Sequence, residues 1–233
     1  MERSGEKDNR TLAELAAGQM IDLIRLKKYA PGDRLPTEAE LSELLGVGRN
    51  TVREAVRILV SRNIVTVRQG SGTFISEKLG VADDPFGFSL VENRQKLTRD
   101  LIQIRAILEP PIAALAAQNA TDEEVEVLRK ILLEIEELIE KREDYAQKDV
   151  EFHEQIAHCS HNSVMSNLVP VIGNGVAVFA REVQSTEYKQ TLISHRAIYE
   201  AIRRGRAVEA QQAMYFHLLY NENRYLEELG ENM

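Results

Sequence analysis

The sequence has 233 residues, of which 43% are hydrophobic, so it can bury a core in one large or two modest domains and is not a disordered chain. Its one cysteine excludes an intramolecular disulfide, and no apolar run is long enough for a signal peptide or a membrane span. These features predict a cytoplasmic protein, and the net charge of −8 argues at first against nucleic acid as its partner.

The charge is unevenly distributed along the chain. Residues 1–80 contain 13 Lys/Arg against 11 Asp/Glu, a net of +2, whereas the remaining residues contain 16 against 26, a net of −10. Between residues 46 and 70 there are five arginines and a single acid, Glu54. A local basic patch inside an acidic protein is typical of a DNA-binding unit, although charge alone is equally consistent with a solvated helix face.

The first third of the chain shows two short helices after a longer one, followed by a hairpin. Thr37 opens a capping box, TEAE, in which the hydroxyl and the glutamate satisfy amide groups at the start of a helix, and Gly46 to Gly48 break that helix. This order predicts a winged helix-turn-helix. The predicted elements are helices over 11–27, 37–45 and 50–62, and strands over 64–67 and 73–75.

The hydrophobic residues have helical spacing from residue 98 onward. The preceding stretch, which contains ADDPFGFS, shows no regular spacing. Pro110 and Pro111 lie inside the first of these helices and should kink it, because two amide donors are missing. The helices are predicted over 98–119, 121–144, 145–159, 163–182, 189–204 and 207–229. We therefore expect a mainly α protein, with a winged helix-turn-helix over 10–76, a linker over 77–97 and an all-helical bundle over 98–229.

The segment LPTEAELSELLGVGRNTVREAVRILVSRNIVTVRQGSGTFI resembles the GntR family of bacterial regulators. Arg49 stands where a recognition helix enters the major groove, and its guanidinium can bind guanine O6 and N7 together. Arg53 lies one turn further on the same face. The resemblance implies DNA contacts from Arg49, Asn50, Thr51, Arg53, Gln69 and Gly70, with a further phosphate contact from Arg34.

Two residues depart from the family pattern in this segment. Ala39 stands where family members often have arginine, so a contact from the second helix is in doubt. Gly48 replaces the usual Ser or Thr before the recognition helix; glycine is acceptable as a cap but offers no hydroxyl to a phosphate. Both changes predict different or weaker DNA contacts, with binding retained.

The C-terminal region resembles the FadR-type subgroup of the same family, in particular its FCD domain. The matching pieces are IRAILEPPIAALAA, DVEFHEQIAHCSHN, SHRAIYEAIRRG and AVEAQQAMYFHLL. The resemblance implies a metal site made of Asp149, His153, His195 and His217. Taken singly, each histidine is more often a core or surface residue than a ligand. Together, one carboxylate and three imidazoles suit Zn²⁺ or Ni²⁺, and Asp149 and His153 lie one turn apart on one helix face.

An effector site is also implied by the resemblance. Arg105 would point into the same region and hold an effector carboxylate in a charge-assisted pair, although an arginine here could also pair helices or lie on the surface. Asn174, between two glycines, and Arg181 are weaker candidates for the same site. A metal beside Arg105 predicts a small organic acid as the effector, such as a hydroxy acid, a keto acid or a sugar acid.

Two histidine patterns invite a different interpretation. HEQIAH is similar to the metalloprotease motif HExxH, but its histidines, His153 and His158, are five residues apart instead of four, so the protease geometry fails. His158, Cys159 and His161 also resemble a metal cluster. They lie at a predicted helix end before Asn162, and we interpret them as an ordinary polar turn.

These features together predict a homodimeric transcriptional regulator, more often a repressor than an activator, that binds an inverted-repeat operator in double-stranded DNA. A bound effector would change its operator affinity. Two alternatives remain at this stage. One is a metal-dependent hydrolase, against which no general base beyond the metal ligands and no nucleophile motif is found. The other is a protein-interaction module whose winged helix does not contact DNA.

Overall fold

Two separate hydrophobic cores organise the chain. The computed structural model describes residues 10–77, 80, 84–179, 188–228 and 230, and it divides the chain into a unit of residues 1–85 and a unit of residues 86–233. The first unit is small and contains both helices and strands, and the regular elements in the described part of the second unit are all helices. The predicted mainly α fold, with a small hairpin near the N-terminus, is confirmed.

The N-terminal unit begins its helices with local caps. Thr37 is the N-cap of the second helix, and the predicted capping box is present: the Glu40 amide donates to the Thr37 hydroxyl, and the Thr37 amide donates to the Glu40 carboxylate. Gly46 ends this helix in the left-handed region, with φ of 65°. The elements of this unit are α1 (Leu12–Lys27), α2 (Glu38–Leu45), α3 (Arg49–Ser61), β1 (Val65–Arg68) and β2 (Gly72–Ile75).

The wing is the antiparallel pair β1–β2, in which Val65 pairs with Ile75 and Arg68 with Gly72. Val65 and Ile75 are both fully buried and pack into the helical core of the unit. The segment before α2 runs alongside β2, since the Leu35 amide donates to the Thr73 carbonyl at 2.8 Å. The wing is therefore held to the helices at its base, while its tip is exposed.

The C-terminal unit consists of six helices in its described part, preceded by a short 3-10 turn, η1 (Phe88–Leu90). Helix α4 begins at Arg94, four residues earlier than periodicity indicated, because the Asn93 side chain caps it by accepting from the Lys96 amide at 2.9 Å. The helices are α4 (Arg94–Asn119), α5 (Asp122–Lys141), α6 (Ala146–Cys159), α7 (Met165–Phe179), α8 (Tyr188–Arg203) and α9 (Ala207–Glu228).

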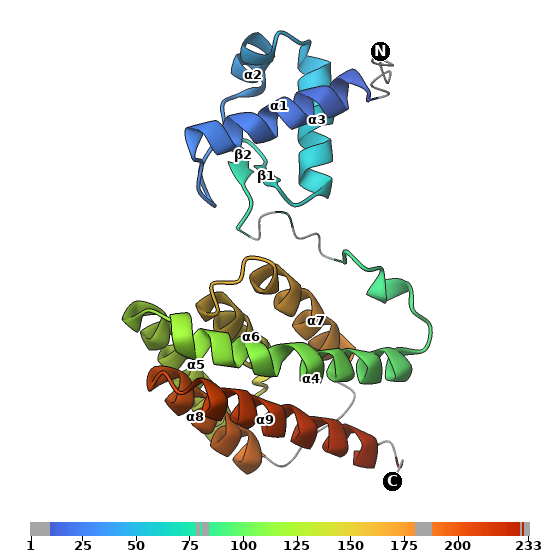
Figure 1. Cartoon of the computed structure of the whole chain (residues 1–233). Helices are drawn as coiled ribbons and strands as arrows, with labels where there is room; N and C mark the ends of the chain where they lie inside the picture. Colours follow the sequence, from blue (N-terminus) through green and yellow to red (C-terminus); the bar gives the residue numbers. More distant parts are fainter. Residues whose placement is uncertain (1–9, 78–79, 81–83, 180–187, 229, 231–233) are drawn as a thin grey trace, which may run out of the picture. The chain divides into compact units, whose positions relative to one another are not determined.

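Helix α4 is the central element of this bundle and packs against α6, α7, α8 and α9 (Figure 1). It continues as one helix through Pro110 and Pro111. Helix α7 approaches α4 closely at Gly175, where a Cβ atom would lie 2.9 Å from Leu101 Cδ1. This packing brings the buried faces of α4, α6, α8 and α9 together in the interior of the bundle.

None of the helices in the described ranges is both long enough and apolar enough to cross a membrane. Except for α7, the helices described in the bundle each carry several charged side chains, as in the DEEVEVLRKILLEIEELIEK sequence of α5. Their apolar side chains face a common core that includes Leu128, Ile135, Phe152 and Met214.

Candidate metal centre and nucleic-acid interface

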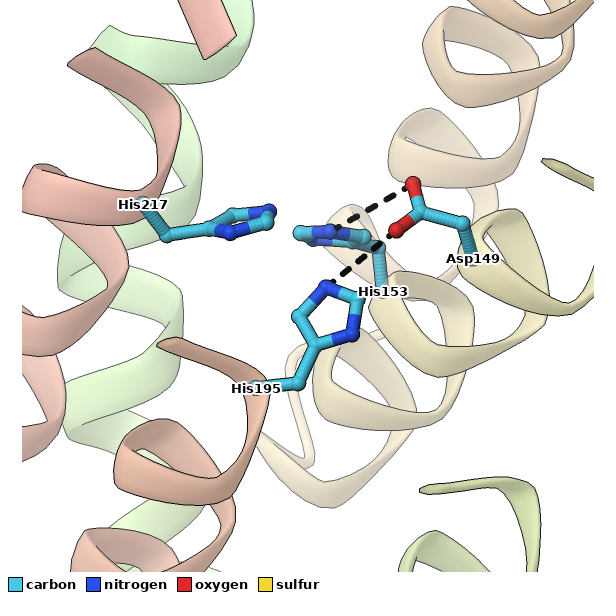
Figure 2. Close-up of side chains that lie close together, drawn as sticks. All are labelled: Asp149, His153, His195 and His217. Carbon is cyan, nitrogen blue, oxygen red and sulfur yellow. Dashed lines mark ion pairs between the residues drawn. The ribbon is translucent and has the colours of Figure 1, made fainter. Parts of the chain in front are cut away.

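The four predicted metal ligands converge inside the C-terminal bundle (Figure 2). Asp149 and His153 project from α6, His195 from α8 and His217 from α9. One potential ligand atom from each of the four lies within 4.8 Å of the others. Helix α6 and the consecutive helices α8 and α9 therefore supply one compact set of donors.

This cluster is largely buried, yet several of its polar atoms lack a well-directed hydrogen bond to another described residue. The three histidines are at most 2% exposed, and the Asp149 side chain is 20% exposed. His195 Nε2 lies 3.2 Å from Asp149 Oδ1, and His153 Nε2 lies 3.9 Å from Asp149 Oδ2 (Figure 2). Within the described part of the chain, however, His153 Nε2 and both nitrogens of His195 have no well-directed hydrogen-bond partner. Since buried polar atoms are rarely left unpaired, these lone pairs fit a metal ion.

The protonation states of the cluster also suit metal ligation. Burial lowers the pKa of His195 and holds the pKa of His217 well below its usual range, so both rings are neutral near pH 7. Burial alone would raise the pKa of Asp149, but the contact with His195 and the charges of His153 and Arg105 outweigh it and place the pKa well below its usual range. A carboxylate and neutral imidazoles are the forms that bind a cation.

These shifts predict how the metal-free protein responds to acid. The folded state holds His195 and His217 neutral, whereas the unfolded chain takes up protons as the pH falls through about 6.5. The free energy of unfolding of chelator-treated protein should therefore decrease as the pH is lowered from 8 to about 5. Urea unfolding at a series of pH values measures it. His217→Gln should flatten the dependence and His158→Gln, an exposed histidine, should not; a flat wild-type profile would contradict the prediction.

Two buried residues of α4, Glu109 and Arg105, lie beside the cluster. Glu109 Oε2 lies 2.5 Å from His153 Nδ1, and Arg105 Nε donates to Glu109 Oε1 at 2.6 Å. Burial alone would raise the pKa of Glu109, but the charges of Arg105 and His153 outweigh it and lower the pKa to about 2. A carboxylate on Nδ1 orients an imidazole and leaves its Nε2 for a metal. Glu109 therefore positions His153.

Sequence reasoning missed Glu109, although a signal was present. It is the only acid in the run IRAILEPPIAALAA and stands four residues after the only base, Arg105. This is the spacing of an ion pair on one helix face. The structure adds that both residues are buried, at 6% exposure for Arg105 and 3% for Glu109. His217 also has neighbours that were not foreseen: Ser194 Oγ lies 2.9 Å from its Nδ1, and Asn221 Nδ2 lies 3.2 Å from its Nε2.

The predicted effector residues are placed unequally. Arg105 is connected to the cluster through Glu109, as described above. Asn174 lies half-buried on α7, and its side chain makes no hydrogen bond or ion pair within the described part of the chain. Arg181 falls outside the described residues. Of the two candidates that the structure describes, Arg105 alone is thus brought into the same buried group as the metal ligands.

The prediction of a polar turn at the end of α6 holds for the two histidines but not for Cys159. His158 and His161 are exposed and both contact Glu124, with His161 Nε2 at 2.9 Å from Glu124 Oε2 and His158 Nδ1 at 3.2 Å from Glu124 Oε1. Cys159, in contrast, is a fully buried core residue, and burial raises the pKa of its thiol to about 11. The expectation for Cys159 was wrong because it points to the core side of α6, while the neighbouring His158 points outward.

The predicted DNA contacts lie at the start of α3 and on the wing. Arg49 is the first residue of α3, and its N-cap, Gly48, makes no side-chain cap, as its identity predicted. Gly70 at the wing tip has a φ of 72°, which favours glycine. Thr51 is half-buried, and the exposed members of the predicted set are Arg34, Arg49, Asn50, Arg53, Gln69 and Gly70.

Arg53 has a partner that sequence reasoning did not assign. Its Nε donates to Glu38 Oε2 at 2.7 Å, and both side chains are partly exposed. The bond fixes one edge of the guanidinium and leaves its two terminal nitrogens for another ligand. Glu38 is the glutamate of the LPTE motif, so its position in the matched segment was the available signal.

A winged helix-turn-helix joined to a helical bundle with a buried cluster of metal-ligand type defines a DNA-binding regulator that carries a second, ligand-binding type of domain. The comparisons with known proteins agree. Residues 12–75 match bacterial regulatory proteins of the gntR family, and residues 100–219 match the FCD domain. The chain belongs to the GntR family, in the group with an FCD domain.

Similar proteins include the Uxu operon transcriptional regulator of Escherichia coli K12, 33% identical over 90% of this chain and 85% of that protein. The galactonate operon transcriptional repressor of the same strain is 30% identical over 87% of this chain and 91% of its own length. The solved structure described as Streptococcus agalactiae GntR is 41% identical, with a TM-score of 0.80, over 90% of this chain and 98% of that one. The chain is therefore a DNA-binding transcriptional regulator and not an enzyme, so the hydrolase alternative falls.

Proposed function

We propose that this protein is a homodimeric repressor that binds an inverted-repeat operator. Its affinity for the operator would change when a small carboxylate binds beside a metal ion in the helical unit. The observation that carries the effector part is the buried cluster of Asp149, His153, His195 and His217. Among the described residues, its His153 Nε2 and both nitrogens of His195 lack a well-directed hydrogen-bond partner. The DNA part rests on the exposed residues at the start of α3 and on the wing.

The donor set suits Zn²⁺ or Ni²⁺, held by the Asp149 carboxylate and one nitrogen of each histidine. The ion would supply a Lewis-acidic charge with coordination positions left for an oxygen ligand. Glu109 would hold His153 in the ligating tautomer through Nδ1. Ser194 would do the same for His217, since its hydroxyl lies 2.9 Å from Nδ1.

The charges in this buried group explain why an acidic effector would need the metal. Asp149 and Glu109 are ionised and Arg105 is cationic, so these three groups together carry a net charge of −1. A divalent ion changes this net charge to +1. A carboxylate would therefore be repelled from the metal-free site and attracted to the loaded one.

Arg105, Asn174 and Arg181 are the residues of this chain that we propose line the effector site. Arg105 uses its Nε for Glu109, which leaves its terminal nitrogens to bind a carboxylate. The two Escherichia coli relatives are regulators of the Uxu operon and of a galactonate operon, which favours a sugar acid among the candidate carboxylates. The effector must bind one arrangement of the DNA-binding units better than another, since a ligand without such a preference shifts no equilibrium.

A ligand panel tests this proposal. Citrate, lactate, pyruvate, galactonate and glucuronate are each added to zinc-loaded protein and to chelator-treated protein, and the Tm is measured. We expect at least one acid to raise the Tm of the loaded protein by several degrees and to leave the chelated protein unchanged, because binding only to the folded state stabilises it. Failure of every acid with the loaded protein, or equal shifts with and without metal, would overturn the metal-dependent carboxylate site.

A further inference from the structure

His217 differs from the other two histidines of the cluster because both of its ring nitrogens have hydrogen-bond partners. Ser194 Oγ lies 2.9 Å from Nδ1, and Asn221 Nδ2 lies 3.2 Å from Nε2. In contrast, His153 Nε2 and both nitrogens of His195 have no well-directed partner among the described residues. One of the three proposed histidine ligands is therefore already engaged in the metal-free protein.

The contacts of Ser194 show which nitrogen of the His217 ring carries the proton. Ser194 Oγ donates its single proton to the Thr191 carbonyl oxygen at 2.9 Å. The hydroxyl therefore accepts a hydrogen bond from His217, so the ring proton is on Nδ1. A neutral imidazole with its proton on Nδ1 has its lone pair on Nε2, which makes Nε2 the nitrogen that can bind a metal ion.

The Asn221 amide donates to this lone pair. Asn221 follows His217 by four residues on α9, so the two side chains share one face of the helix. The amide nitrogen is a donor and not an acceptor, which agrees with a lone pair on Nε2; the reversed amide would bring Oδ1 against that lone pair. Two separate neighbours, one at each ring nitrogen, thus indicate the same tautomer of His217.

A metal ion and the Asn221 amide cannot use His217 Nε2 at the same time. A zinc–nitrogen bond is about 2.0–2.1 Å long and uses the lone pair to which the amide donates. Because the amide nitrogen lies only 3.2 Å from Nε2, an ion in that position would meet the amide group. Asn221 is half-buried, and its side chain makes no other hydrogen bond to a described residue. The amide can therefore turn away when this one bond breaks.

We infer that Asn221 competes with the metal ion for His217 Nε2 and thereby lowers the metal affinity of the cluster. This inference rests on the metal site of the proposed function and deepens it, because it names a residue that regulates how readily the ion is held. Ser194 and Asn221 act on the same ring in opposite directions. The serine keeps the lone pair on Nε2, whereas the asparagine satisfies that buried nitrogen in the metal-free protein and so opposes loading.

The zinc affinity of two variants of the full chain tests this inference. Zinc is titrated into metal-free protein in competition with a chromophoric chelator, which gives the Kd for zinc. Asn221→Ala should bind zinc about 2- to 10-fold more tightly than the wild type, because the ion no longer has to break a hydrogen bond. Ser194→Ala should bind zinc about 10- to 100-fold more weakly, because a ligating histidine loses its supporting partner. Damage to the packing of the site would weaken binding in both variants, so the opposite signs identify competition.

Asn223→Ala is the matched control, since Asn223 is an exposed asparagine of α9, and it should bind zinc like the wild type. Nitrogen-15 NMR of the metal-free wild type reads the tautomer directly and should place the His217 proton on Nδ1. An unchanged or weaker zinc affinity in Asn221→Ala, or a proton on Nε2 in the metal-free wild type, would overturn the competition by Asn221 alone. A wild-type protein that bound no zinc would overturn the metal site of the proposed function together with it.

Discussion

His217→Ala and Asp149→Ala are each expected to remove metal that wild-type protein holds at close to one ion per chain. Each substitution deletes one of four converging donors, and the Asp149 change also removes the anionic ligand. Loss of outer contacts alone commonly lowers metal affinity by about 10- to 100-fold, so loss of a direct ligand should exceed about 100-fold. Elemental analysis of the purified proteins and calorimetric titration of zinc into chelated protein measure both quantities.

Two further variants make this metal series specific. Glu109→Gln should retain the site but lower its affinity by about 10- to 100-fold, because the Gln side chain orients His153 without a charge. His158→Ala should bind metal like the wild type, since His158 is exposed and contacts Glu124 instead of the cluster. Full metal content in both His217→Ala and Asp149→Ala would remove the metal from the proposed function and leave Arg105 as the remaining anion-binding group.

Arg49→Ala is expected to weaken operator binding strongly and to relax its sequence preference. A bidentate arginine–guanine pair contributes about 1–3 kcal/mol of discrimination, and a two-fold dimer would lose two of them, or about 2–6 kcal/mol. The affinity for the operator should therefore fall by about 30-fold to more than 10⁴-fold. Arg49→Glu should abolish specific binding, because it places a negative charge at the first residue of α3, which we propose enters the negatively charged DNA groove.

Selection from random duplexes supplies the operator for this measurement, and anisotropy titrations compare it with a scrambled duplex. Arg62→Gln is the control for Arg49→Ala, because it also removes one positive charge, at the exposed C-terminal end of α3. It should bind the operator within a few-fold of wild type. Glu38→Gln should lie between the two, since it frees the Arg53 guanidinium without removing its charge. If Arg49→Glu bound the operator as the wild type does, the recognition helix would not be α3.

The features that sequence reasoning placed correctly are those set by contacts within a few residues. The capping boxes at Thr37 and Thr121 each join a hydroxyl and a glutamate three residues apart, so their residue types reveal the helix starts. Asp149 and His153 share a helix face for the same reason. The start of α4 was missed because its cap, Asn93, lies in a stretch without periodicity, although asparagine is a good cap.

The sequence by itself determined the helices, the wing and, through resemblance, the four clustered ligands. Only the tertiary structure decided what surrounds them. Glu109 contacts His153 across 44 residues because α4 packs on α6, and a helical pattern does not state which helices pack. Likewise, the Arg68 guanidinium lies 4.5 Å from the centroid of the Phe74 ring because β1 and β2 pair in this register. A slip of one residue would move these side chains to the buried face.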